Sequence, residues 1–540
     1  MKLTLILLLM LCISSINNAI AETYQNPVLP GFHPDPSITR VGNDYYLVNS
    51  SFEWYPGVPI FHSTDLVKWQ QIGHVLNRPS QLNMINNRSS SGVWAPTIRH
   101  HNGKYYVIVT CKQCGNNFYV VSDQPEGPYS DPIYLKTPKG IDPSLFFDDD
   151  GKVWFSANRF PKEPDYKSQH IIYTQQVDLN KGVLFGPRYD LTDGKDCGVV
   201  ATEGPHHYKI DDTYYLITAE GMTWNNHAVC VYSAPTPHGP FKLLENNPAL
   251  THRDKPELPI QHTGHADLVQ TQFGDWWALV LGVRKIDGHY YLGRETFLTP
   301  VKWRHGTPVF NPESEQLTLT GTAPKLPTNK IRAIPDVDNF AHIQLALHWN
   351  FLRTPQTNWW SLFHRKGWLE IELRPNTLTQ PTNPSLIARR FQHFDFIAAT
   401  EIDFTPKVDG EEAGIAAVQN DRFQYRLVIK QTDSKQVLQL IKVFHKDRKV
   451  KQEVIVKQKP YEGEKVLAFE VHGLDIQFKI GTSKTSLKNF ADVQDASILS
   501  STRSGGFTGA FTGMYASSNG KISDNKAYFN WFEYRPLSKP

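Results

Sequence analysis

The stretch GNDYYLV, residues 42–48, joins a tight turn to a short run of bulky residues, and the chain repeats this device four more times. Turn residues followed by a bulky pair recur as NDYY (43–46), GKYY (103–106), GKVW (151–154), DTYY (212–215) and GDWW (274–277). Each copy reads as strand, turn, strand, and the copies stand about sixty residues apart. Repeats with about four strands each are typical of a β-propeller, so the sequence predicts a five-bladed propeller.

One position recurs a short way before each bulky pair. Aligning the five repeats there gives Asp35, Ala95, Asp142, Glu203 and His265. In a propeller the first strand of each blade lines the central axis, so equivalent positions form a ring at one end of the channel. The sequence therefore predicts that three acids and a histidine converge, although they are far apart along the chain.

The acids also have a purely structural explanation. Asp before Pro-Ser is a common turn residue, which would account for Asp35 and Asp142 without any chemistry. The second repeat keeps the turn as Ala95-Pro96-Thr97 but carries no acid. Because the turn does not need a carboxylate, the acids at this position favour a chemical role.

The predicted fold is all-β, in two domains. Residues 22–305 form the propeller, and residues 306–337, rich in Pro, Thr and Asn, read as a linker. Residues 338–540 show alternating patterns such as WLEIELRP (368–375) and VLQLIKVFH (437–445), which are typical of a β-sandwich.

The first 21 residues are typical of a signal peptide. Lys2 provides the positive start, Leu3 to Ile13 the apolar stretch, and Ala19-Ile20-Ala21 a small-x-small cleavage site. The stretch is too short to cross a bilayer, and a buried N-terminal helix is the alternative. We expect an exported protein, periplasmic or extracellular.

The remaining cysteines do not indicate a disulfide scaffold or a metal centre. Cys111-Lys-Gln-Cys114 is a lone CxxC, and Cys197 and Cys230 stand apart from it. Zinc would need more ligands at suitable spacing, and a redox role would need a βαβ context. Buried thiols or one local disulfide are therefore favoured for the CxxC pair.

The charge balance excludes several partners. Lys and Arg number 56 and Asp and Glu 53, giving a net charge of +3. Such a balance creates no overall field that would attract nucleic acid or an anionic membrane. The oligomeric state is not fixed by any sequence feature.

Carboxyl groups in different environments are what hydrolysis of a glycosidic bond requires. One must be ionised to activate water, and another protonated to reach the leaving oxygen. A third acid nearby raises the pKa of the second by like-charge repulsion. Asp35, Asp142 and Glu203 meet this requirement, but the repeat pattern does not assign their roles.

Aromatic and basic residues near the strand starts suit a sugar ligand. Trp54 and Trp94 could stack on a pyranose face, with burial in the core as the alternative for each. Arg294 could bind a hydroxyl, or form a surface ion pair with Glu295. His265 could be a core residue, a metal ligand or a modulator of a catalytic pKa, while His206 and His207 are expected at the strand surface.

Several motifs together resemble glycoside hydrolase family 43, in its exo-acting β-xylosidase and α-L-arabinofuranosidase branch. They are NPVLPGFHPDPSI (26–38), SGVWAPTIRH (91–100), IDPSLFFDDDG (141–151), ATEGPHHYK (201–209), GHADLVQT (264–271), LGRETF (292–297) and FTGAFTGMYAS (507–517). The resemblance covers nearly the whole mature chain. It implies that the C-terminal domain is a concanavalin-like jelly roll that closes the active site.

The resemblance also assigns roles. Asp35 matches the general base, Glu203 the general acid, and Asp142 the residue that orients Glu203 and raises its pKa. The family inverts anomeric configuration in a single displacement, which requires room for a water between acid and base. Xylo-oligosaccharides or arabinoxylan would be the substrate, without a required cofactor.

Further residues match the sugar pocket of this family. Trp94 corresponds to an aromatic wall and Arg294 to an arginine that contacts the sugar. Phe507 corresponds to the ring that closes the pocket, with Phe511 as the alternative. His265 matches the axial histidine, which allows a structural calcium ion bound to it through waters.

Two other hypotheses fit the same pattern. A propeller lectin would bind sugars without hydrolysing them. A retaining or fructan-active propeller glycosidase would keep the fold and change the chemistry. The preference between β-D-xylosides and α-L-arabinofuranosides is not readable from the sequence.

Overall fold

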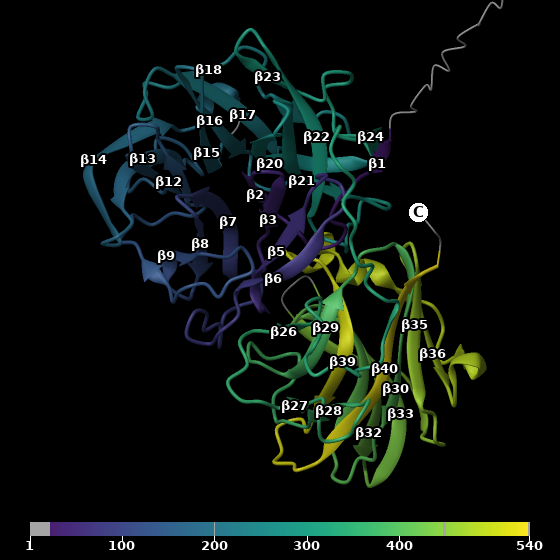
Figure 1. The fold of residues 1–540 in the computed structure, drawn as a ribbon. Helices are drawn as coiled ribbons and strands as arrows, with labels where there is room; N and C mark the ends of the chain where they lie inside the picture. The colour runs from purple at the N-terminus through teal and green to yellow at the C-terminus, as the bar shows by residue number, and fades with distance from the viewer. Residues whose placement is uncertain (1–21, 199, 447–449, 538–540) are drawn as a thin grey trace, which may run out of the picture.

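Five antiparallel sheets surround a central axis in the computed structural model, which describes residues 22–198, 200–446 and 450–537 (Figure 1). Blade one contains β2 (Ser37–Val41), β3 (Asp44–Val48), β5 (Gly57–Ser63) and β6 (Gln70–Leu76). Blade two contains β7 (Gly92–His101), β8 (Lys104–Lys112), β9 (Asn116–Ser122) and β10 (Ile133–Tyr134). Blade three contains β11 (Ser144–Phe147), β12 (Val153–Arg159), β13 (Ile171–Asp178) and β14 (Val183–Thr192).

The remaining blades follow the same order. Blade four contains β15 (Glu203–Ile210), β16 (Thr213–Glu220), β17 (Ala228–Ala234), β18 (Lys242–Leu243) and the extra strand β19 (Leu250–Thr251). Blade five contains β20 (Ile260–Gln270), β21 (Trp276–Arg284), β22 (Glu295–Arg304) and β23 (Thr307–Phe310). The first strands of the five blades contact one another in a closed ring, so they line the axis. The predicted five-bladed propeller is confirmed.

The N-terminal segment closes the ring of blades. β1 (Thr23–Gln25) pairs with β24 (Thr320–Thr322), which lies beyond the last blade in sequence. The side chain of Asn26 exchanges hydrogen bonds of 2.9 Å with the backbone of Leu298 on β22. The propeller therefore extends past residue 305, where the linker was predicted to begin. That boundary is wrong because β23 completes blade five.

The second domain is a sandwich of two sheets. The first follows the order β27 (Trp360–Ser361), β28 (Leu369–Glu372), β40 (Lys526–Pro536), β30 (Asp395–Asp403), β35 (Val466–His472), β36 (Asp475–Gly481) and β37 (Lys488–Asn489). β25 (Val337–Asp338) pairs with β40, and β38 (Gln494–Asp495) with β36. The few short helices are η1 (Lys195–Cys197), η2 (Lys484–Ser486), η3 (Ala496–Leu499) and α1 (Ser501–Ser504).

The second sheet of the sandwich includes a strand from the propeller. Its order is β34 (Val450–Pro460), β33 (Lys435–Lys446), β32 (Phe423–Thr432), β31 (Glu412–Asn420), β39 (Phe511–Ser517), β29 (Ser385–Arg390), β26 (Asn350–Leu352) and β4 (Trp54–Tyr55). β4 lies between two strands of blade one in sequence, yet it pairs with β26, Trp54 opposite Leu352. Backbone hydrogen bonds therefore join the two domains side by side (Figure 1).

Side chains reinforce this junction. The Trp54 indole stacks on Phe511 with ring centroids 3.6 Å apart and an interplanar angle of 14°. Buried Arg353 of the sandwich donates through Nε to the Asn87 carbonyl at 2.6 Å, and Arg390 donates through Nε to the Phe32 carbonyl at 2.7 Å. At these contacts the interface is buried and fixed by directional bonds.

Two predictions about the rest of the chain have different outcomes. Cys111 and Cys114 form a local disulfide, one of the two arrangements favoured, and Cys197 and Cys230 form a second disulfide that the sequence did not indicate. The predicted signal peptide, residues 1–21, lies outside the described residues. Within the described part of the chain, no helix has the length and hydrophobicity that a membrane-spanning segment requires.

The stack at the domain junction can be tested by Trp54→Ala. Removing a fully buried aromatic ring costs about 3–5 kcal/mol, so we expect the unfolding midpoint to fall by roughly 5 °C or more in calorimetry. Tyr134→Ala, which removes a ring that is 52% exposed on β10, serves as the control and should leave the midpoint nearly unchanged. Equal unfolding midpoints for Trp54→Ala and the wild type would contradict the expected contribution of the Trp54–Phe511 stack to stability.

Candidate active site

Each blade carries a left-handed residue either just before its innermost strand or within it. The φ angles are 53° at Asp35, 39° at Ala95, 57° at Asp142, 57° at Gly204 and 46° at His265. In blade four this conformation falls on Gly204, so the repeat alignment that placed Glu203 there is wrong by one residue. The ladder irregularities agree: pairing is interrupted after Trp94 in blade two and after Glu203 in blade four. Glu203 therefore corresponds to Trp94 rather than to Asp35.

Asp35 is a buried carboxylate held at both oxygens. Arg294 donates through Nη1 to Oδ1 at 2.9 Å, and the Ser50 hydroxyl donates to Oδ2 at 2.5 Å. The backbone N–H of Ala95 donates to the Ser50 oxygen at 2.6 Å, which directs the hydroxyl proton toward Asp35. Asp35 is 5% exposed, and its carboxyl oxygens only accept hydrogen bonds in these contacts.

Asp142 and Glu203 lie in a different electrostatic environment. Burial raises the pKa of the Asp142 carboxyl to about 8, and the charge of Asp35 acts in the same direction. Burial, followed by the charges of Asp142 and Asp35, raises the pKa of Glu203 well above its usual range. Asp142 also accepts a hydrogen bond of 3.1 Å from the Gly204 N–H, directly after Glu203. A proton is therefore retained on this pair at neutral pH.

Arg294 stands directly before β22 and faces this acidic cluster. It is 7% exposed and donates to Thr223 Oγ1 at 3.1 Å in addition to Asp35. Its Nε and Nη2 atoms have no hydrogen-bond partner among the described residues, so they are available to a ligand. The alternative ion pair with Glu295 is absent among the described residues, because Glu295 is bound by Arg284 at 2.8 Å.

Aromatic rings from both domains surround Arg294. Phe507 of the sandwich lies against Trp94 at 5.8 Å and stacks on Trp224 at 5.5 Å between ring centroids. The Arg294 guanidinium lies 5.2 Å from the centroid of Phe52 and 5.8 Å from that of Phe507. Phe507, Trp94 and Trp224 are only partly buried, so ring surface remains accessible beside the carboxylates.

Phe507 is fixed by a residue of the propeller. Its backbone N–H donates to Ser90 Oγ at 2.9 Å, and the Ser90 carbonyl accepts from the Trp94 indole at 3.1 Å. The Ser90 N–H in turn donates to the buried Glu53 carboxyl at 2.9 Å. One serine therefore positions two rings of the pocket, one from each domain.

The prediction that Trp54 contacts a ligand is wrong. Its ring is 1% exposed because it stacks on Phe511, itself fully buried at the domain junction. Neither ring presents a face to solvent. Of the two phenylalanines considered for the pocket, only Phe507 lies beside Trp94 and Arg294.

The propeller axis below the carboxylates is filled by a buried ion pair. Arg99 of β7 binds Asp267 of β20 through both Nη atoms, at 2.9 and 3.2 Å. Although burial opposes it, the charge of Arg99 holds the pKa of Asp267 below its usual range. Arg99 also contacts His206 Nδ1 at 3.0 Å. The expectation that His206 and His207 lie at the surface is wrong, since both are buried.

His265 lies between this ion pair and the acidic cluster. Its Nδ1 is 4.0 Å from Asp35 Oδ1, its ring centroid is 6.3 Å from that of His206, and burial lowers its pKa. Calcium prefers six to eight oxygen ligands, whereas His265 offers one nitrogen and the nearby Asp267 carboxylate is bound to Arg99. No group of three His, Cys, Asp or Glu side chains in the described residues is arranged to hold a metal. The side chains alone do not fit calcium, and a water-coordinated ion beside His265 stays a prediction.

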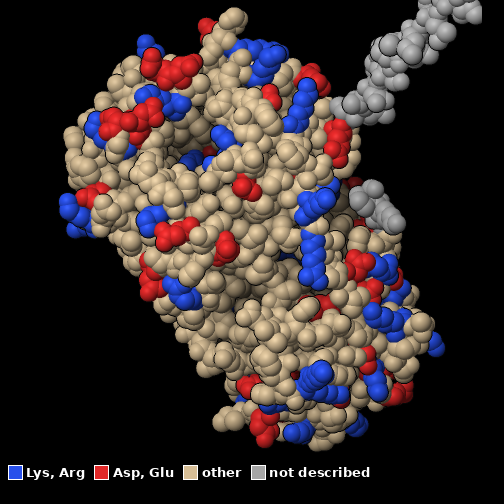
Figure 2. Space-filling model, in the orientation of Figure 1, with Lys and Arg blue, Asp and Glu red and all other residues tan. Residues whose placement is uncertain are grey.

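The structure thus brings together Asp35, Asp142, Glu203, Arg294 and Trp94 from five blades, with Phe507 from the sandwich and His265 beneath. Figure 2 shows a hollow at the centre of the propeller, where the innermost strands meet. Sequence reasoning missed Ser50, Phe52, Thr223 and Trp224. The segments SSFEW (50–54) and MTW (222–224) follow β3 and β16, the second strands of blades one and four, and both contain aromatic residues. This pattern is the signal that could have indicated them.

Comparisons with known proteins give matches over both domains. A family model described as glycosyl hydrolases family 43 matches residues 24–308, and one described as a beta xylosidase C-terminal concanavalin A-like domain matches residues 337–535. A non-reducing end alpha-L-arabinofuranosidase of Bacteroides ovatus is 37% identical, and the match covers 98% of each chain. A xylosidase/arabinosidase of Butyrivibrio fibrisolvens is 37% identical over 94% of this chain and 98% of its own.

Solved structures show the same architecture. The crystal structure of a xylan beta-1,4-xylosidase from Bacillus halodurans superposes with a TM-score of 0.89 at 34% identity, covering 95% of this chain and all of that one. A Bacteroides ovatus structure titled as GH43B of a xyloglucan locus gives a TM-score of 0.88 at 36% identity, covering 96% of this chain and all of its own.

The environment of Asp142 predicts a pH dependence of stability. The unfolded chain loses this proton near pH 4, whereas the folded chain keeps it to about pH 8. Between these values the folded state binds more protons, so wild-type stability falls as pH rises. Asp142→Asn removes this titration and should gain about 1 kcal/mol or more relative to the wild type from pH 5 to pH 8, measured by urea unfolding.

Asp150→Asn is the matched control, because Asp150 is exposed on the turn that follows β11. Its stability difference from the wild type should stay level over the same range. A level difference for Asp142→Asn as well would contradict the raised pKa.

Proposed function

The chain belongs to glycosyl hydrolase family 43, and from this premise we propose that it releases single pentoses from the ends of xylo-oligosaccharides or arabinoxylan. It is a glycosidase of a family that inverts anomeric configuration. The observation that carries the proposal is the contrast between Asp35, bound by Arg294 and Ser50, and the protonated pair Asp142–Glu203 beside it.

This contrast supports a division of roles. Asp35 accepts hydrogen bonds on both oxygens and would take the proton of the attacking water as general base. Glu203, whose pKa is raised, would give its proton to the leaving oxygen as general acid. Asp142 would hold the backbone next to Glu203 through the Gly204 N–H, and whenever Asp142 loses its proton, the negative charge it gains would raise the pKa of Glu203 further.

The remaining contacts support binding of one small sugar. Two free nitrogen atoms of Arg294 would donate to sugar hydroxyls, and Trp94 with Trp224 would pack against the apolar face of the ring. Phe507 supports an exo mode of action, because this ring of the sandwich packs against Trp94 and Trp224 beside the carboxylates and would block the passage of a polymer across the site. Relatives of both named activities share these lengths and folds, so we propose that one pocket serves β-D-xylosides and α-L-arabinofuranosides alike.

Export of the chain stays a prediction. The two disulfides support it, because disulfides persist mainly in oxidising compartments outside the cytosol.

The products of xylotetraose test the proposed function. We expect xylose and xylotriose as the first products, and proton NMR should show that the xylose is released as its α-anomer. Xylobiose as the first product would contradict the exo mode of action, and release of β-xylose would contradict inversion. Complete absence of turnover on xylotetraose and on both p-nitrophenyl pentosides would favour a sugar-binding propeller instead.

The proposed roles of Asp35 as base and Glu203 as acid predict different losses of kcat when each is replaced. Asp35→Asn removes the base and should lower kcat by about 10²–10⁴ on every substrate. Glu203→Gln should lose as much on xylobiose, but about tenfold or less on an aryl xyloside, whose phenolate leaves without protonation. Equal losses of Glu203→Gln on both substrates would contradict its role as general acid; Glu126→Gln, on an exposed loop, is the matched control.

A further inference from the structure

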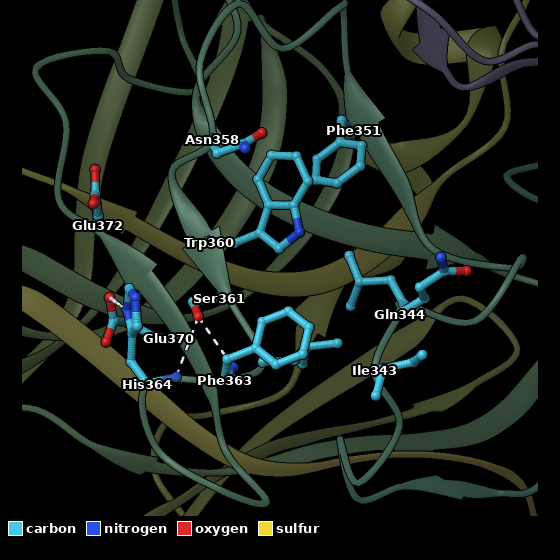
Figure 3. Close-up of a pocket in the computed structure, with 12 residues that line it drawn as sticks. Ile343, Gln344, Phe351, Asn358, Trp360, Ser361, Phe363, His364, Glu370 and Glu372 are labelled. Carbon is cyan, nitrogen blue, oxygen red and sulfur yellow. Dashed lines mark hydrogen bonds and ion pairs between the residues drawn. The ribbon is translucent and has the colours of Figure 1, made fainter.

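A second pocket lies on the sandwich domain, and none of its lining residues belongs to the propeller. It opens where the edge strand β27 of one sheet meets β26 of the other, and it measures about 520 Å³ (Figure 3). This volume is within the range of roughly 300–1,000 Å³ that is typical of ligand sites.

Aromatic rings form one side of this pocket. Trp360 packs on Phe351 with centroids 4.5 Å apart, which fixes its orientation while leaving the indole partly exposed. Phe363 is 72% exposed. The turn that carries it is held by Ser361 Oγ, which accepts from the N–H groups of Phe363 and His364 at 3.1 and 3.3 Å (Figure 3). Ile343, which is 75% exposed, also lines the pocket, so two large apolar side chains rather than one isolated ring are presented to solvent here.

Uncommitted polar groups lie around these rings. The side chains of Gln344, Asn358 and Glu372 line the pocket, and none makes a hydrogen bond to another described residue. Figure 3 shows Asn358 and Gln344 on either side of the Trp360 and Phe351 rings. Amide donors and acceptors next to a ring face form the combination that binds a sugar, since hydroxyls need partners and the C–H face needs an apolar surface.

The charges of the pocket disfavour anionic ligands. No Lys or Arg is among its lining residues. The carboxylate of Glu370 pairs with Lys526 at 2.5 Å and contacts His364 Nδ1 at 2.9 Å, and the side chain of Glu372 also lines the pocket. Without a Lys or Arg in its lining, the pocket offers no fixed cation to phosphate, nucleic acid or uronic acids, whereas a neutral ligand rich in hydroxyls needs none.

We propose that this pocket is an accessory binding site for a neutral polysaccharide chain of the arabinoxylan type. The choice of polymer rests on the proposed function, whereas the sugar-binding chemistry rests on Trp360, Phe363 and the three uncommitted polar side chains. The site holds the polymer at a distance from the carboxylates and takes no part in bond cleavage.

Affinity electrophoresis of the full chain in gels with soluble arabinoxylan tests this proposal. The parent protein is Asp35→Asn, so that the polymer stays intact during the run. We expect arabinoxylan to retard the parent, and Phe363→Ala or Asn358→Ala in that background to raise the apparent Kd about five- to tenfold. Phe273→Ala on the propeller, where the ring is 66% exposed, is the matched control and should bind like the parent.

Other outcomes would overturn the proposal. They are an unretarded parent, and equal retardation of Phe363→Ala and the parent. A larger elution volume of Phe363→Ala in size-exclusion chromatography, with unchanged retardation, would instead identify the patch as a contact between two copies of the chain.

The proposed function is measured separately on small substrates. Phe363→Ala with Asp35 intact should hydrolyse p-nitrophenyl pentosides with wild-type kcat/KM, because these substrates reach only the propeller site. If the wild type hydrolysed neither p-nitrophenyl pentoside, the proposed function would be refuted. Retardation by arabinoxylan that depends on Phe363 would still support the accessory site.

Discussion

The active site depends on one backbone constraint, the left-handed residue that each blade carries just before or within its innermost strand. This conformation interrupts the regular ladder, so the side chain at its centre is directed differently from those of the strand. In blades one and three the residue is an aspartate, and Pro follows it in both. The left-handed conformation is strained for residues other than glycine, and the packed ring of strands keeps these residues in it. Because every blade contributes one such position, groups from distant parts of the sequence meet at a single end of the axis.

The pKa values of the three buried acids depend on how few positively charged side chains lie beside them. Arg294 contacts only Asp35 among them, so the other two carboxyls compete for protons in a desolvated space. The second buried arginine on the axis, Arg99, is committed to Asp267 and contributes no charge to Asp142 or Glu203 that is strong enough to lower their pKa. A further cation at this end would ionise all three acids and remove the proton that acid catalysis requires.

The sequence predicted the architecture because the propeller is a repeat, and repeated turn chemistry is visible without any long-range information. It also brought Asp35, Asp142 and Glu203 together, although it misplaced Glu203 by one residue because Gly204, not an acid, takes the left-handed position in blade four. Trp54 could not be placed correctly, since nothing local shows that β4 leaves its blade to pair with β26. Ser50, Ser90 and Trp224 were missed because their roles arise from contacts that only the fold creates. Ser50 contacts Asp35 of its own blade and Ala95 of the next, while Ser90 and Trp224 contact Phe507 of the sandwich.

The junction between the domains explains how the sandwich could both cover the active site and hold a polysaccharide substrate. β4, Arg353 and Arg390 fix the sandwich against the propeller, so Phe507 is held over the pocket rather than closing on it as a mobile lid. A pocket roofed in this way accepts only chain ends, and a polymer has few ends compared with internal residues. Chain ends would therefore be scarce at the pocket when the substrate is long. An accessory site on the same rigid body would raise the local concentration of ends near the pocket without contacting the reacting sugar.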